Sequence, residues 1–231
     1  MANAVASYAT YRWFESNYYH QRNNMKQALI LGCSHAAGSE MGTDEYGRAH
    51  SYPVQLADLM GYQATNRAIP GGSNDAMFRI FQEQINNYDI VIVCWTGIAR
   101  TELWDTQSQT WLPMAHGVVL GNHNRSDLHE YGRQWTVYQH TQQAGHLTKT
   151  KNILALNFLA HSKNIPVINI DSFQPVDWPE RMTWPASMLW PVLTTFCGWA
   201  LQHHYSHTDN GHFDLDAHTA FANYVFKNMA G

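Results

Sequence analysis

Short apolar segments alternate along this chain with segments that have a helical period. Three of the apolar segments are almost wholly apolar: 28–32 (ALILG), 89–95 (DIVIVCW) and 165–170 (IPVINI). A fourth segment, 63–68 (QATNRA), is a weaker candidate strand. Apolar runs of this length are typical of strands buried on both faces of a parallel sheet. Apolar positions at helical spacing fall in 53–60, 77–85, 151–161 and after residue 216. The alternation predicts an α/β fold in which helices cover both faces of a parallel sheet, with ligands bound at the carboxyl ends of its strands.

The length of 231 residues suits one α/β domain rather than two. We expect residues 27–231 to form this domain, preceded by an aromatic-rich arm over residues 1–26 that docks on the domain or on another subunit. Residues 96–148 have no clear period and interrupt the alternation of strands and helices. We interpret this segment as an insertion that covers the ligand site.

Composition argues against several classes of partner. The formal net charge is −4 and no basic run occurs, which argues against nucleic acid. No apolar stretch reaches the ~18 residues that a membrane span needs. The N-terminus lacks the pattern of a secretory signal, so a cytoplasmic location without membrane contact is expected by default. Three cysteines at irregular spacing, Cys33, Cys94 and Cys197, argue against a disulfide framework.

Two segments carry residues suited to nucleophilic catalysis. Ser34 lies two residues after Gly32, where the first strand should end, so its hydroxyl would lie beside the free N–H groups of a helix start. Near the C-terminus, Asp209 precedes His212 by three residues, so one turn could supply a general base and the acceptor that orients it. Taken singly, these residues are better explained by a serine that caps a helix and by a polar turn before a helix.

A glycine-rich turn follows the second candidate strand. Residues 66–74 read NRAIPGGSN, which places Gly71, Gly72 and Asn74 at the same edge of the sheet as Ser34. A glycine lets the backbone approach a substrate closely, and its N–H can stabilise an oxyanion. The alternative is a tight turn into the next helix, which Ser73 or Asn74 would cap.

In order and spacing these segments resemble the SGNH hydrolases, also called GDSL-type esterases. The first block of that family, Gly-Asp-Ser-x-x-x-Gly, is similar to residues 32–38, which read GCSHAAG. Its second block places an oxyanion glycine five residues after an asparagine, as Gly71 follows Asn66. Its last block, Asp-x-x-His, is similar to Asp209 and His212. The resemblance covers residues 27–228 in outline.

The chain departs from the family pattern in two places. Cys33 stands where the first block has an aspartate. The third block, Gly-x-Asn-Asp after the third strand, is missing: Thr96 falls at its first glycine and Ile98 at the asparagine that donates to the oxyanion. Either Thr96 or Arg100 would replace this donor, or Arg100 would pair with Glu102 and shape the loop. We favour the ion pair.

The resemblance implies a three-layer α/β/α sandwich with a mostly parallel sheet of about five strands. It also implies ester hydrolysis without a metal or other cofactor. Ser34 would attack an acyl carbonyl, His212 would take its proton, and Asp209 would orient His212. The N–H groups of Ser34 and Gly71 would stabilise the oxyanion. An O-acetylated glycan is the expected substrate, because an aromatic, weakly charged insertion suits the faces of sugars.

Two other functions stay open. A non-catalytic structural or glycan-binding protein would explain the altered third block and the aromatic arm. A metal-dependent hydrolase would use the His and Asp residues between 203 and 218, although no HExxH-like spacing occurs there. The Trp-Thr and Arg-x-Glu of residues 95–102, with Ser-Tyr-Pro at 51–53, are similar to bacteriophage members of the group. A virion-associated location therefore stays open as well.

Overall fold

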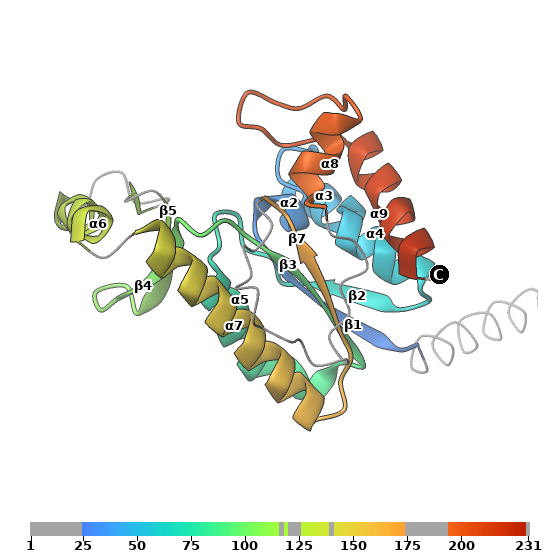
Figure 1. Ribbon diagram of the computed structural model, residues 1–231, viewed down its shortest axis with the longest axis horizontal. Helices are drawn as coiled ribbons and strands as arrows, with labels where there is room; N and C mark the ends of the chain where they lie inside the picture. The colour runs from blue at the N-terminus through green and yellow to red at the C-terminus, as the bar shows by residue number, and fades with distance from the viewer. Residues whose placement is uncertain (1–24, 116–117, 120–125, 139–140, 174–193, 230–231) are drawn as a thin grey trace, which may run out of the picture.

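A computed structural model of the chain describes residues 25–115, 118–119, 126–138, 141–173 and 194–229 (Figure 1). The predicted N-terminal arm over residues 1–26 lies outside the described residues except for its last two positions. No helix in these ranges is both long enough and apolar enough to cross a membrane.

A parallel sheet forms the centre of the molecule. Its strand order is β2-β1-β3-β7, with bounds Gln63–Asn66, Gln27–Gly32, Ile90–Trp95 and Val167–Asp171 respectively. Every residue of β3 and β7 is buried, as the apolar segments predict. The α/β class is confirmed, and the sheet has four strands within the described residues where about five were expected.

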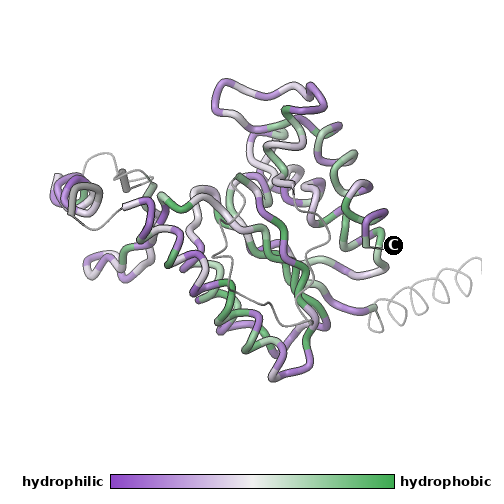
Figure 2. The backbone as a smooth tube through the Cα atoms, viewed as in Figure 1, coloured by the Kyte–Doolittle hydropathy of each residue, from purple (hydrophilic) through white to green (hydrophobic). Residues whose placement is uncertain are grey.

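Helices cover both faces of this sheet because successive strand residues point to opposite sides. Ala28 and Ile30 of β1 join the core beneath one helical layer, and Leu29 and Leu31 join the core beneath the other. The first layer contains five helices: α2 (Ser34–Ala37), α3 (Asp44–His50), α4 (Tyr52–Leu59), α8 (Phe196–Gln202) and α9 (Leu215–Met229). The second layer contains α5 (Asn74–Gln84) and α7 (Gln142–Ser162) (Figure 1). Figure 2 shows the hydrophobic strands between the two layers.

Helix starts follow local capping chemistry. Ser73 caps α5, because its Oγ accepts a hydrogen bond from the N–H of Ala76 at 3.1 Å. Thr141 caps α7 in the same way, so this helix begins nine residues before the helix predicted over 151–161. Between α5 and β3 the chain forms a 3₁₀ turn, η1 (Ile85–Asn87).

The segment predicted as an insertion, 96–148, has structure of its own. Three strands form an antiparallel sheet: β4 (Arg100–Asp105), β5 (Thr110–Ala115) and β6 (Val118–Val119). Helix α6 (Ser126–Tyr138) follows and lies beside β6. Figure 1 shows α6 and the β4–β5 hairpin on the far side of the sheet from α8 and α9. The interpretation of this segment as a cover over the ligand site stays a prediction.

Candidate active site at the carboxyl edge of the sheet

Ser34 is the first residue of α2, immediately beyond the end of β1. Gly32 makes this tight junction feasible, since a Cβ there would lie 3.0 Å from Cys94 Cβ and would collide with Ala36. The side chain of Ser34 is nearly buried, at 6% exposure. Its backbone N–H has no hydrogen-bond acceptor among the described residues, because it belongs to the open first turn of a helix.

Asn66 ties the segment after Ser34 to the end of β2. Its Nδ2 donates to the carbonyl oxygen of Ala36 at 2.8 Å and to Ser51 Oγ at 3.1 Å. Its Oδ1 accepts from the N–H of Ala68 at 3.0 Å. The asparagine of the second block is therefore a structural connection that fixes the Ser34 helix relative to the glycine-rich turn.

The glycine-rich turn reaches the same edge, where the N–H of Ile69 donates to the carbonyl oxygen of Gly32 at 3.0 Å. Gly71 has a φ of 74°, a left-handed conformation that favours glycine. Its N–H has no acceptor among the described residues, whereas the N–H of Gly72 is used within the turn, donating to Ile69 at 2.7 Å. Gly71 is therefore free to donate to an oxyanion, and Gly72 serves the turn.

His212 lies between α8 and α9, in a turn closed by a hydrogen bond from the N–H of Thr208 to the carbonyl oxygen of His212 at 2.8 Å. Its ring makes an edge contact with the ring of His35, the residue after Ser34, with centroids 5.1 Å apart. The structure thus brings His212 beside the Ser34 helix. No hydrogen bond joins the side chains of Ser34 and His212, both of which are described. Catalytic hydrogen bonds are often long or poorly aligned without substrate.

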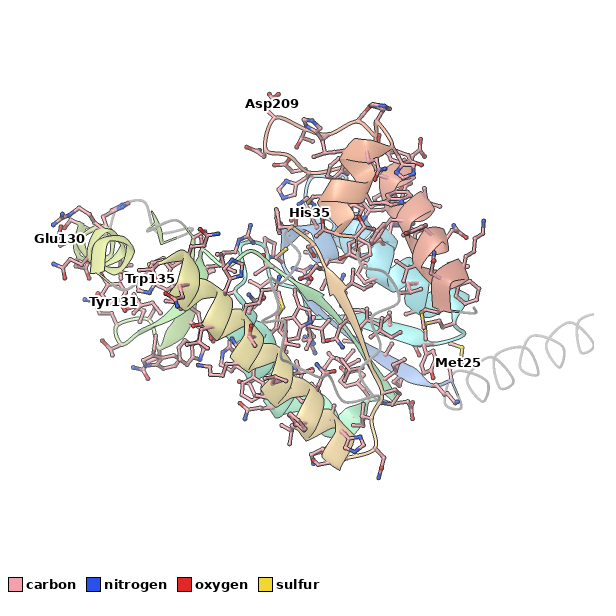
Figure 3. All side chains as sticks on the ribbon, viewed as in Figure 1. Met25, His35, Glu130, Tyr131, Trp135 and Asp209 are labelled. Atoms are coloured by element: carbon pink, nitrogen blue, oxygen red, sulfur yellow. The ribbon has the colours of Figure 1, made fainter. Side chains whose placement is uncertain are left out.

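Asp209 is not brought to His212. It is exposed at the outer end of the loop, and Figure 3 places it far from His35. Neither a hydrogen bond nor an ion pair of Asp209 is found within the described residues. The carboxylate near the imidazole belongs instead to Glu40, whose Oε2 lies 3.2 Å from His212 Nδ1. The role of Asp209 as the orienting acid stays a prediction, and no contact with His212 within the described residues supports it.

Comparison with solved structures places this arrangement in a known fold. A lipase from a goat rumen metagenome, Lip_vut3, matches with a TM-score of 0.53 and 13% identity over 90% of this chain and 99% of the lipase. A structure assigned to the lipolytic G-D-S-L family, from Desulfitobacterium hafniense DCB-2, matches with a TM-score of 0.50 and 12% identity over 88% of this chain and 99% of the other.

The chain has the SGNH-hydrolase fold. This confirms the fold that the sequence blocks predict, and at such low identity the likeness concerns the fold alone. No family model matches the sequence, and no curated protein matches it. The two structures give no support to the narrower resemblance to bacteriophage members.

The two other histidines near this candidate site have structural environments. Burial lowers the pKa of His218 to about 3, and its Nδ1 accepts a hydrogen bond from the N–H of Tyr52 at 3.0 Å. Burial also lowers the pKa of His35 well below its usual value, helped by the nearby charges of His212, His218 and Arg100. Both side chains are at most 2% exposed, so His212, at 17%, is the more accessible candidate for the base.

The third block of the SGNH pattern is replaced by a buried connection. The amide of Asn74 is engaged on both sides, because its Oδ1 accepts from the N–H of Thr96 at 3.0 Å and its Nδ2 donates to the carbonyl oxygen of Thr96 at 3.4 Å. Thr96 Oγ1 is buried and has no hydrogen-bond partner among the described residues. Ile98, at the position of the missing asparagine, packs against Gly145 of α7, where a Cβ would lie 2.9 Å from its side chain.

The expected ion pair between Arg100 and Glu102 is wrong. Glu102 is held by Arg79 of α5, which donates through Nε at 3.0 Å and Nη2 at 2.8 Å. Arg100 lies with its guanidinium carbon 4.9 Å from the centroid of the Phe173 ring, and this ring also contacts His35 at 4.7 Å. The buried Nη1 of Arg100 has no partner, and no ion pair of Arg100 occurs within the described residues. Within the described residues this guanidinium therefore has no ion-pair partner, and it lies near His35, the residue after Ser34.

The histidine cluster after α8 is dispersed. His203 stacks on Trp199 at 4.4 Å, His207 Nδ1 contacts the carbonyl oxygen of Thr208, and His218 is in the core. Over the described ranges no group of three His, Cys, Asp or Glu side chains is arranged to hold a metal ion. The metal-dependent alternative therefore gains no support from this cluster.

A surface hollow of about 400 Å³ opens beside His212. Its walls include Glu40, Met41, His207, His212, Phe213 and Leu215. Ser34 is not part of its lining, so the hollow lies on the Glu40 side of the imidazole. Sequence reasoning missed Glu40, because nothing in residues 38–41 (GSEM) marks an acid that meets a histidine 172 positions later.

Proposed function

We propose that this protein is a serine ester hydrolase, with Ser34 as nucleophile and His212 as general base. The observation that carries the proposal is the convergence of three segments at one edge of an SGNH fold. Ser34 begins the helix after β1, Gly71 offers a free N–H from the turn after β2, and His212 approaches from the loop before α9. Such a convergence is what acyl transfer by a serine requires.

The proposed reaction needs only protein groups and water. Ser34 Oγ attacks the acyl carbonyl while His212 Nε2 takes its proton, and the negative charge on the carbonyl oxygen is met by the N–H groups of Ser34 and Gly71. The intermediate collapses as the imidazolium protonates the departing alcohol. Water, deprotonated by the same imidazole, then releases the acid and restores Ser34. Arg100 adds positive charge near the oxyanion, where Ile98 lacks a donor.

For the substrate we propose an acyl ester on a glycan, with an O-acetyl group first. Trp104 and Trp111 face each other across the β4–β5 hairpin with ring centroids 5.2 Å apart, and 40% and 42% of their surfaces are exposed. Exposed aromatic rings suit the apolar faces of sugars. The alternative is a non-catalytic glycan-binding protein, which the missing asparagine at Ile98 favours.

Hydrolysis of p-nitrophenyl acetate and of an O-acetylated xylo-oligosaccharide tests the proposal. The unmodified protein should release acetate from both, and Ser34→Ala and His212→Ala should each lower kcat by at least about 10³-fold. His203→Ala is the matched control, because the His203 ring stacks on Trp199 and its Nδ1 contacts the Trp199 carbonyl oxygen, and within the described residues it makes no contact with Ser34 or His212. Binding of the oligosaccharide without hydrolysis would favour the non-catalytic alternative.

A further inference from the structure

Glu40 has a left-handed backbone conformation that residues other than glycine adopt uncommonly. It follows the helix α2 by three residues, and its φ is 67°. Such a conformation is sterically costly for any residue with a Cβ, and it persists only where surrounding contacts hold it. Conformations of this kind are concentrated at functional sites, so the contacts of Glu40 indicate which role its backbone conformation serves.

Those contacts all come from the loop that carries His212. Asn210 Nδ2 donates to Oε1 of Glu40 at 2.6 Å, and Thr208 Oγ1 donates to Oε2 at 2.5 Å. The same Oε2 lies 3.2 Å from Nδ1 of His212. The hydrogen bonds from Thr208 first and then from Asn210 lower the pKa of Glu40, and the neighbouring His212 lowers it further, so Glu40 is a carboxylate at neutral pH.

No other acceptor for Nδ1 of His212 occurs in the part of the chain that the structure describes. This nitrogen is shielded from solvent, and the structure places the carboxylate oxygen of Glu40 3.2 Å away, although within the described residues the two are not aligned for a hydrogen bond. The turn that contains Asp209 is closed by bonds of Thr208 with His212 and with Gly211, and it directs Asp209 outward (Figure 3). The three-residue spacing therefore places Asp209 near His212 in sequence and away from it in space.

We propose that Glu40, rather than Asp209, is the residue that positions the imidazole of His212. Its Oε2 accepts the Nδ1 proton, which leaves Nε2 unprotonated to receive the proton of Ser34 and stabilises the imidazolium that forms. Glu40 contacts neither substrate nor reacting atoms, and acts through His212. The inference rests on the proposed function, because it concerns the base of that reaction.

Kinetics of the full chain on p-nitrophenyl acetate provide the first test. Glu40→Gln keeps the size of the side chain and removes the charge, and its amide N–H favours the wrong tautomer of His212. It should lower kcat by up to about 10⁴-fold, as replacing the orienting acid of a serine triad by its amide does, with little change in KM. The fold loss of kcat in Asp209→Asn should be at least about tenfold smaller than the loss in Glu40→Gln. The reverse order of the two variants would overturn the proposal.

Glu40 also holds the loop, so a second measurement separates positioning from anchoring. Asn210→Ala removes one loop contact of Glu40 and leaves the carboxylate, so it should keep most of the activity. Glu40→Gly suits the positive φ and leaves a space that a small carboxylate can enter. Formate should raise kcat of Glu40→Gly at least about tenfold, and should not affect Glu40→Gln, which fills the space. If formate does not raise kcat of Glu40→Gly, and Asn210→Ala loses as much kcat as Glu40→Gln, then Glu40 only anchors the loop.

A proton NMR signal gives an independent check. A His Nδ1 proton donated to a carboxylate resonates downfield of the backbone amides, so the unmodified protein and Asp209→Asn should show this signal and Glu40→Gln and His212→Gln should lack it. If the signal disappears in Asp209→Asn instead, the proposal is wrong while the serine mechanism stands. If Ser34→Ala keeps full ester turnover, the proposed function fails, and the role of Glu40 fails with it.

Discussion

Replacing Arg100 by Met should remove much of the catalytic rate and leave the fold nearly as stable. The substitution loses a cation–π contact with Phe173 worth about 0.5–2 kcal/mol. It also removes the cost of a buried, unpartnered Nη1, about 1–3 kcal/mol. The two effects largely cancel, so the free energy of unfolding should change by no more than about 2 kcal/mol. Loss of a charge that stabilises the oxyanion should lower kcat by about 10²-fold.

Arg79→Met is the matched control, because Arg79 is the arginine that forms the ion pair with Glu102. Its loss leaves the carboxylate of Glu102, only 8% exposed, without its two hydrogen bonds. Arg79 itself is 23% exposed, so we expect a moderate cost of about 2–3 kcal/mol, or a melting temperature lower by roughly 5–10 °C, with normal kcat in the folded protein.

Thermal melting and steady-state kinetics on a neutral ester distinguish the two arginines. If Arg100→Met has unchanged kcat on p-nitrophenyl acetate, the proposed contribution of Arg100 to the oxyanion is wrong. A KM raised only for anionic esters would assign the charge to the substrate instead. A melting temperature as low as that of Arg79→Met would show that Arg100 stabilises the fold.

Three other predictions concern groups around the site. Because burial lowers the pKa of His218 to about 3, the unfolded chain takes up a proton below pH ~6.5 that the folded chain does not. Stability in urea should therefore be full above that pH and fall towards pH 5, with up to about 1.4 kcal/mol per unit from His218 and a further contribution of the same sign from the buried His35; His218→Asn should reduce the slope by the share of His218. Asn74→Ala should lower the melting temperature by roughly 3–8 °C, because the buried N–H of Thr96 loses its acceptor. KM should not change, and a raised KM would show that Asn74 binds substrate. Ester hydrolysis should survive EDTA, and restoration of a lost activity by Zn²⁺ or Mn²⁺ would contradict the serine mechanism.

The sheet and the position of Ser34 could be predicted because both depend on local sequence. Strands buried on both faces read as continuous apolar runs, as in β3, and Gly32 marks where the first of them must turn. The hairpin of β4 and β5 was missed, since its residues are mostly half-exposed and pair chiefly with each other. A segment of this kind gives no clear period in the sequence.

The partners of charged residues could not be predicted, since they depend on contacts between distant segments. Arg100 and Glu102 are two residues apart, yet α5 places Arg79 closer to Glu102. Asp209 and His212 share a turn, yet its hydrogen bonds direct Asp209 away, and Glu40 arrives from a different segment. In each case the sequence spacing permits an ion pair, and packing decides which carboxylate is within reach.

The identity of the nucleophile is tested most directly by covalent labelling. A fluorophosphonate reacts with a serine only where a base and an oxyanion site activate the hydroxyl. Peptide mass spectrometry of the labelled protein should find one phosphonyl group, on Ser34, and Ser34→Ala should remain unlabelled under the same conditions. Labelling that persists in Ser34→Ala, or that falls on another residue of the unmodified protein, would contradict the account.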